Sequence, residues 1–166
     1  TLPPKDALLT VLGRAGLDKL VAEADEIVGG DVRLFGGDPV SLDLAPHGPL
    51  AHWTAYETGK ADLRPLTFDI LLLWEPARFG WATVLARAYH LTDEEKYAES
   101  FWEYFETFTA ANPPYLGPNW TSGQEAALRI IAWSFCWHLL REAKATTPER
   151  MAALAEAIAI HAKRIS

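Results

Sequence analysis

The sequence predicts an all-α domain, and three observations lead to this prediction. Apolar residues recur at spacings of three and four over the first 28 residues and again from residue 74 onward. Of the 166 residues 49% are hydrophobic and seven are Trp, which excludes disorder and allows a sizeable core. Residues 30–73 interrupt the helical pattern with Gly and Pro. We therefore expect a single domain, 1–166, with a small irregular or β segment at 31–73 between an N-terminal helix and helical hairpins.

The N-terminal helix is expected from Pro4 to Val28. Gly13 and Gly16 predict a kink within it, and the Gly29-Gly30 pair predicts its end. Short strands are expected at 32–35 and 66–72, and the rest of the segment before residue 74 is expected to be loop. Long irregular connections inside compact domains are uncommon and are often functional.

Four helices are expected in the second half, at about 76–90, 92–111, 122–143 and 147–166. Pro76 suits the first position of a helix, and the run Thr92-Asp93-Glu94-Glu95 resembles a capping box. Short connections predict two antiparallel hairpins, which stack into a solenoid or into an incomplete (α/α) toroid. No stop signal precedes Ser166, so we expect the chain to be part of a longer protein.

Composition excludes several function classes. The net charge of −7 argues against nucleic-acid binding and against a basic membrane-docking surface. No apolar run has the length of a membrane-spanning helix, so we expect no membrane insertion. The chain starts at Thr1 without a signal peptide, which leaves export open.

The five His show no metal-ligand spacing and no Gly-rich phosphate loop is present, so neither a metal nor a cofactor is expected. Cys136, between Phe135 and Trp137, is expected to be a buried structural thiol.

Alternating helix directions predict where a site lies. The helices expected to begin near Pro76 and Ser122 are separated by one antiparallel helix, so their N-termini should meet at one rim. This places two groups of residues together: Trp74, Glu75 and Arg78 with Asn119, Trp120, Gln124, Glu125 and Arg129. Helix N-termini, arginines and Trp faces suit an anionic, ring-shaped ligand such as an acidic sugar. We expect the Arg129 guanidinium to lie between Glu125 and Trp133 and to face this ligand.

Simpler interpretations of the same residues stay open. Glu125 and Arg129 can be an ordinary helical ion pair, since they are four residues apart. Trp133 and Trp137 can belong to the core, and Asn119 can cap the following helix. His52, next to Trp53, is the other candidate outside the rim.

Three segments in fixed order carry a resemblance. They are WEPAR at 74–78, LARAY at 85–89, and the stretch 112–130, which contains NP, GPNW and EAALRI. This ordered set resembles the N-terminal helical domain of the heparinase II/III-type polysaccharide lyases and their bacterial relatives, over roughly residues 22–166. The resemblance implies an (α/α) toroid followed by a β-sandwich domain, and a periplasmic or secreted location.

The resemblance also implies a chemistry, which is β-elimination next to a uronic acid in an acidic polysaccharide. One group neutralises the uronate carboxylate, a base removes the carbon-bound proton, and an acid, commonly Tyr, protonates the departing oxygen. The family's Asn-His motif and Tyr lie beyond Ser166, and this chain has no Asn-His pair. No catalytic residue is therefore expected here, and the isolated chain is expected to be inactive. The implied substrate-binding residues are Arg78, Asn119, Trp120, Gln124, Glu125 and Arg129.

Two other functions remain in view. One is a non-catalytic helical module that binds glycans or proteins. The other is a tetratricopeptide-like adaptor, suggested by residues 85–106. It ranks low because the period does not repeat in the next hairpin.

Overall fold

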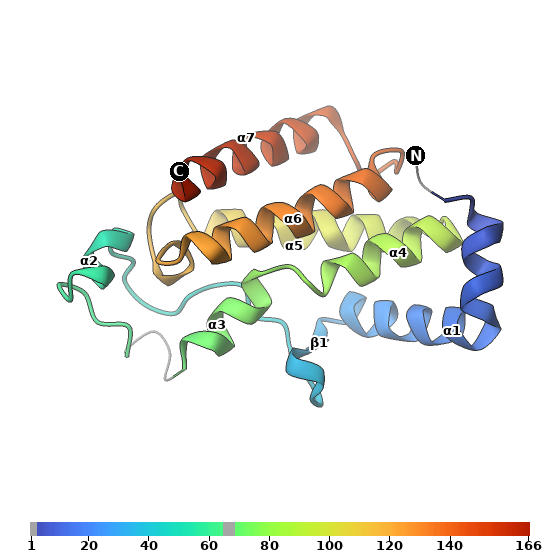
Figure 1. Cartoon of the computed structure of the whole chain (residues 1–166), viewed down its shortest axis with the longest axis horizontal. Coiled ribbons are helices and arrows are strands. Elements are labelled where there is room, and N and C mark those ends of the chain that lie inside the picture. Colours follow the sequence, from blue (N-terminus) through green and yellow to red (C-terminus); the bar gives the residue numbers. More distant parts are fainter. Residues whose placement is uncertain (1–2, 65–68) are drawn as a thin grey trace.

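The computed structural model describes residues 3–64 and 69–166, and this part of the chain is mostly helical (Figure 1). In chain order the elements are α1 (Lys5–Val28), β1 (Asp31–Arg33), the 3-10 turn η1 (Leu34–Gly36), β2 (Pro39–Ser41), α2 (Trp53–Glu57), α3 (Ile70–Ala77), α4 (Ala82–Thr92), α5 (Glu95–Ala111), the 3-10 turn η2 (Pro118–Trp120), α6 (Gly123–Leu140) and α7 (Pro148–Ile165).

Helix α1 is bent into an elbow, as Gly13 predicted (Figure 1). Gly13 has φ 67° and ψ 174°, a conformation that L side chains rarely adopt. The second segment of α1 packs against α4 through its buried face, which consists of Leu20, Ala24 and Ile27. The helix ends at Gly29 and Gly30, as expected.

Helices α4 to α7 alternate in direction along the chain (Figure 1). Helices α4 and α6 lie side by side and point the same way, α5 packs on α4, and α7 packs on α6. This arrangement agrees with the two antiparallel hairpins predicted from the short connections. Within the described residues, no helix is both long and apolar enough to cross a bilayer.

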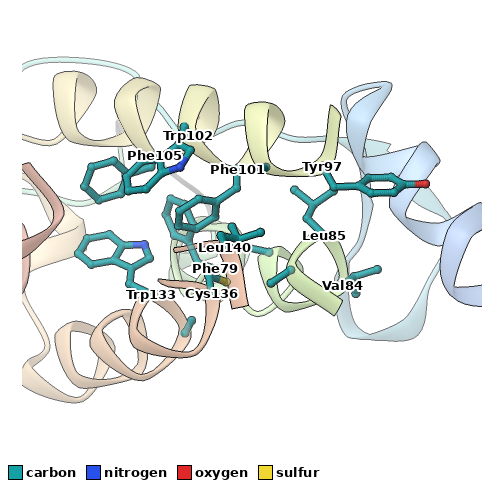
Figure 2. Packing of buried hydrophobic residues seen from close by; sticks show 14 of the residues in the cluster. Phe79, Val84, Leu85, Tyr97, Phe101, Trp102, Phe105, Trp133, Cys136 and Leu140 are labelled. Carbon is teal, nitrogen blue, oxygen red and sulfur yellow. The ribbon is translucent and has the colours of Figure 1, made fainter. Parts of the chain in front are cut away.

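Aromatic side chains fill the space between the hairpins (Figure 2). Trp102 and Phe105 from α5 face Trp133 from α6, and the Phe105 and Trp133 ring centroids are 5.2 Å apart in an edge-on arrangement. Trp133 and Cys136 are fully buried in this cluster, so the core interpretation of Trp133 is correct. Trp137 is partly buried and packs against the same core. Burial raises the pKa of the Cys136 thiol, as expected for a structural cysteine.

The region around Pro76 differs from the sequence prediction. A helix begins at Ile70, before Pro76, so Ile70 to Leu72 are helical and not the strand expected at 66–72. The first part of that predicted strand, 66–68, lies outside the described residues. Asp69 caps α3 by accepting a hydrogen bond from the Leu71 N–H at 2.9 Å. The predicted continuous helix 76–90 is also wrong, because the chain leaves the helical conformation after Ala77 and resumes it at Ala82.

Phe79 causes this break. It has φ 59°, which is costly for a non-Gly residue. Its ring is fully buried and packs 5.2 Å from Phe108 and 5.5 Å from Trp133, centroid to centroid. Tertiary packing therefore offsets the backbone strain, and the break divides the expected helix into α3 and α4.

The remaining differences are local. β1 pairs antiparallel with β2 through Val32 and Val40, but the strand expected at 32–35 ends at Arg33. The short helix α2 lies within the segment expected to be loop. The N-cap of α5 is Glu94, and its side chain accepts no hydrogen bond from the first turn of the helix. The capping box expected to begin at Thr92 is therefore not formed. Helix α6 ends at Leu140, short of the expected residue 143.

Candidate functional site

The end of α3 and the start of α6 meet at one rim of the helical layer, so Arg78 and Glu125 lie together as predicted. The prediction that two helix N-termini meet there is wrong, because Arg78 follows the C-terminal end of α3 and the next helix, α4, begins only at Ala82. Arg78, directly after α3, donates from Nε to Glu125 Oε2 at 2.7 Å and from Nη2 to Glu125 Oε1 at 2.8 Å. Trp74 in α3 donates from its indole Nε1 to the Pro118 carbonyl at 3.0 Å. These bonds fix α3 to α6 and to η2.

Local sequence places Glu125 at this point. Ser122 is the N-cap of α6, and its hydroxyl accepts from the Glu125 N–H at 3.5 Å. A carboxylate in the first turn of a helix is stabilised by the helix dipole. Ser122 rather than Asn119 therefore caps α6, and the capping interpretation of Asn119 is wrong.

Arg78 carries the positive charge of the rim. It also pairs with Glu75, and these two acceptors raise the pKa of the Arg78 guanidinium above its usual value. The Arg78 side chain is 26% exposed, whereas that of Glu125 is only 3% exposed. One arginine thus balances two carboxylates, and the net charge of this group of three is −1.

Arg129 lies behind this rim and is completely buried. Its Nε donates to His161 Nε2 at 3.0 Å, and its Nη2 donates to the Asn119 carbonyl at 2.5 Å. Its guanidinium carbon lies 5.5 Å from the Phe108 ring centroid and 5.9 Å from that of Trp120. Burial lowers the pKa of Arg129 to about 9. The expected position between Glu125 and Trp133 is therefore not the one found, because Glu125 pairs with Arg78 instead.

His161 on α7 completes the buried cluster. Its Nε2 accepts from Arg129, so the proton of the neutral ring lies on Nδ1, which donates to the Ala157 carbonyl at 2.8 Å. Its ring packs against that of Trp120, with centroids 4.4 Å apart and planes tilted by 40°. Burial and the charge of Arg129 lower the pKa of His161 to about 3.

Asn119 and Asn112 form a relay of side-chain amides. Asn112 Nδ2 donates to the Leu44 and Phe108 carbonyls at 2.8 and 2.9 Å, so its Oδ1 accepts from Asn119 Nδ2, at 2.8 Å. Asn119 and Asn112 are both buried. The relay ties the irregular segment to α5 and η2 and makes Asn119 a structural link.

Four buried polar atoms of the cluster have no hydrogen-bond partner among the described residues. They are Asn119 Oδ1, Trp120 Nε1, Arg129 Nη1 and Trp133 Nε1. Of these four residues, Trp120 also lines a 230 Å³ hollow between α5 and α7, together with His161 and Phe108. The aromatic faces around Arg129 take the place of oxygen acceptors for part of its charge.

The solvent-facing part of the rim is a different set of residues. Gln124, in the first turn of α6, is exposed. Tyr56 and Trp74 line a 250 Å³ hollow at the N-terminus of α6, together with Glu57, Leu63, Ile70, Thr121 and Ser122. Arg164 lies beside it, 3.7 Å from the Trp53 ring centroid, and donates to the Trp120 and Thr121 carbonyls at 2.8 Å each.

All six expected substrate-binding residues lie at or just behind the rim, but they differ in accessibility. Asn119, Trp120, Glu125 and Arg129 are buried, Arg78 is about one quarter exposed, and Gln124 is exposed. In this conformation the four buried residues support the rim and are not accessible to a ligand.

Sequence reasoning missed Tyr56, His161 and Arg164. The buried positions Leu154, Ala157 and His161 follow helical spacing along α7, and this pattern could have identified His161. Tyr56 and Arg164 reach the rim only through the tertiary fold. His52 is exposed and caps α2, where its side chain accepts from the Thr54 N–H.

The residues described here contain no group of three or more His, Cys, Asp or Glu that could hold a metal ion. Fold and rim together define a mostly helical protein with an aromatic hollow where α3 meets α6, beside the paired Arg78 and Glu125. No protein-family model matches the chain, and neither a curated protein nor a solved structure matches it.

Proposed function

We propose that this chain forms part of the substrate cleft of an (α/α)-toroid polysaccharide lyase that cleaves uronic-acid-containing polymers by β-elimination. The catalytic Asn, His and Tyr belong, in this proposal, to residues outside these 166. The proposal rests on the resemblance of the ordered segments at 74–78, 85–89 and 112–130 to the heparinase II/III-type lyases.

The observation that carries the proposal furthest is that the first and third of these segments lie together in the fold. The first and third of them are joined by the two hydrogen bonds between Arg78 and Glu125. Parallel neighbours α4 and α6, each covered by an antiparallel partner, are the arrangement that a toroid repeats.

The accessibility of the side chains leads to a different set of sugar-contacting residues from the set expected from the sequence. We assign contact to Gln124, Trp74, Tyr56 and the accessible edge of Arg78, since these are the groups that reach solvent or line the hollow. Aromatic faces pack on the apolar face of a sugar ring, and the Gln124 amide both donates and accepts hydrogen bonds. Asn119, Trp120, Glu125 and Arg129 act in this scheme as positioning residues.

A non-catalytic module that binds glycans or proteins is the second candidate. It is favoured by the electrostatics of the rim, because Arg78 is already paired with two carboxylates and Arg129 is buried. An acidic polymer would have to compete with Glu75 and Glu125 for the same guanidinium, whereas a neutral glycan would not.

Titration of the chain with defined oligosaccharides separates the two candidates. We expect a hexuronate-containing oligosaccharide to perturb the amide resonances of Gln124 and Tyr56 and the indole resonance of Trp74. Binding should weaken with added salt, because a charged contact is screened. Preference for a neutral oligosaccharide of equal length would favour the non-catalytic module, and absence of binding to either would refute the cleft assignment.

Gln124→Ala is the matched variant, since Gln124 is exposed and its loss leaves the buried cluster intact. Ser134→Ala, an exposed position further along α6, is the control. We expect Gln124→Ala to weaken oligosaccharide binding by about threefold to tenfold, the usual value of one hydrogen bond, and Ser134→Ala to leave it unchanged.

A further inference from the structure

A large hollow in the described part of the chain lies far from the rim, inside the elbow of α1. It has a volume of 550 Å³ and is walled by α1, α4 and α6. Its lining is mainly apolar and includes Leu8, Val11, Leu12, Phe135 and Leu139. Contiguous apolar surface of this kind on a folded domain marks an interaction site.

Helix α6 carries a row of apolar residues, two of which, Phe135 and Leu139, line this hollow. Ile131, Phe135 and Leu139 follow one another at intervals of four residues; Ile131 is 66% and Phe135 41% exposed, whereas Leu139 is only 8% exposed. Rows of residues at this spacing are the ridges by which helices pack against one another. The geometry of the surface therefore fits a helix better than a small molecule.

The first segment of α1, before the Gly13 elbow, is itself an exposed amphipathic helix. None of its residues is buried, and Val11 is 89% and Leu12 40% exposed. The segment is held to the body by an ion pair between Lys5 and Asp93. Helices this short are marginal in water without a packing partner.

We propose that the elbow of α1 is a homodimer interface, in which the first segment of α1 in each copy packs into the apolar hollow of the other. One molecule carries both halves of the contact, a short apolar helix and the hollow beside it, as a two-fold symmetric interface requires. Val11 and Leu12 of one copy then cover Phe135 and Leu139 of its partner, and the reverse contact follows by symmetry. This inference is independent of the proposed function.

Charged side chains at the edge of the hollow support a second copy of the chain as its occupant. Lys19, Glu23 and Arg87 line the hollow and form no ion pair among the described residues, so these three side chains carry a net charge of +1. Asp6, in the first turn of the exposed segment, likewise has no ion-pair partner there. An antiparallel approach of two copies brings the Asp6 carboxylate of each near these cations of the other, which adds direction to an apolar contact.

Sedimentation velocity across a wide concentration series tests the proposal on the intact chain. We expect reversible dimerisation, weakened roughly a hundredfold by Val11→Asp, because the new carboxylate would be buried without a partner in the interface. Val11 is nearly fully exposed in the monomer, so this change leaves the fold intact, which a thermal melt verifies. Met151→Asp, at a 40% exposed apolar position on α7, is the control and should dimerise like the original chain.

Cross-linking gives a second, geometric readout. Mixed Val11→Cys and Phe135→Cys proteins should form a disulfide-linked heterodimer on mild oxidation, whereas Val11→Cys mixed with Met151→Cys should not. The native Cys136 does not interfere, because it is fully buried. A chain that stays monomeric at all concentrations, or a dimer that Val11→Asp leaves unchanged, overturns the proposal and assigns the hollow to a different occupant.

Discussion

Arg78 and Glu125 stand 47 positions apart in the sequence, yet they are joined by two parallel hydrogen bonds of 2.7 and 2.8 Å. The pair bridges the end of α3 and the first turn of α6, and Glu125 is almost completely buried. Such a two-pronged pair gives geometric specificity as well as energy. The rim therefore depends on one contact that neither helix could provide alone.

Glu125→Gln tests this contact. The amide keeps one acceptor for Arg78 but removes the charge, so we expect the free energy of unfolding to fall by about 2–4 kcal/mol. Glu75→Gln is the matched control, because Glu75 meets the same guanidinium from a more exposed position. Its cost should stay below about 1 kcal/mol. Urea unfolding of both variants measures the difference, and equal losses would show that Arg78 is shared evenly between the two carboxylates.

Stability should depend on pH through His161. Its pKa is about 3 in the folded chain and 6.5 in the unfolded chain, so between these values the unfolded state binds more protons. The contribution of neutral His161 is therefore fully present above pH 6.5 and is lost as the pH falls toward 3. Between pH 7 and 4.5 we expect a loss of about 2.5 kcal/mol from this residue.

His161→Gln isolates that contribution, because the amide oxygen can still accept from Arg129 but does not titrate. The variant should lose less stability than the original chain between pH 7 and 4.5 in urea unfolding. The same pH dependence in both proteins would place the acid sensitivity elsewhere.

Helix periodicity predicted most of the fold, and the exceptions have physical causes. The apolar run at 70–73 cannot be assigned to strand or helix by periodicity alone, because an uninterrupted run fits either. The break at Phe79 has no local signal, since positive φ at Phe is stabilised by a ring packed against Phe108 and Trp133. Tertiary contacts determine both the helix at 70–73 and the break at Phe79.

Helix direction predicted that Arg78 and Glu125 lie together, but not that Arg78 follows a helix C-terminus, nor which residues of the rim are buried. Glu125 and Arg129 are one turn apart, and the spacing favours a pair between them. Each instead bonds to a residue more than thirty positions away, Arg78 or His161. A sequence without these long-range contacts cannot reveal which charged side chains are buried.

We expect the isolated chain to show no eliminative activity. The lyase proposal requires a base and a proton donor outside residues 1–166, and the accessible rim offers Gln124 and the paired Arg78 but no Asn-His pair. Elimination creates an unsaturated uronate whose ultraviolet absorbance can be followed continuously. Turnover of heparan sulfate or alginate by this chain alone would place a catalytic centre within it and contradict the proposal.

Arg129→Lys distinguishes a positioning role for Arg129 from direct contact with substrate. The sequence-based hypothesis placed this guanidinium in the cleft, where the variant should weaken binding and preserve stability. The buried position leads to the opposite expectation, since an ammonium cannot reproduce the planar donors that reach His161 and Asn119. We expect the free energy of unfolding to fall by about 2–4 kcal/mol and oligosaccharide affinity, measured on folded protein at low temperature, to change less than twofold. Arg87→Lys, an exposed arginine on α4, controls for the substitution itself. Unchanged stability with a large loss of affinity would mean that Arg129 reaches the ligand in another conformation of the η2 turn, and the assignment of contact to Gln124, Trp74 and Tyr56 would then be wrong.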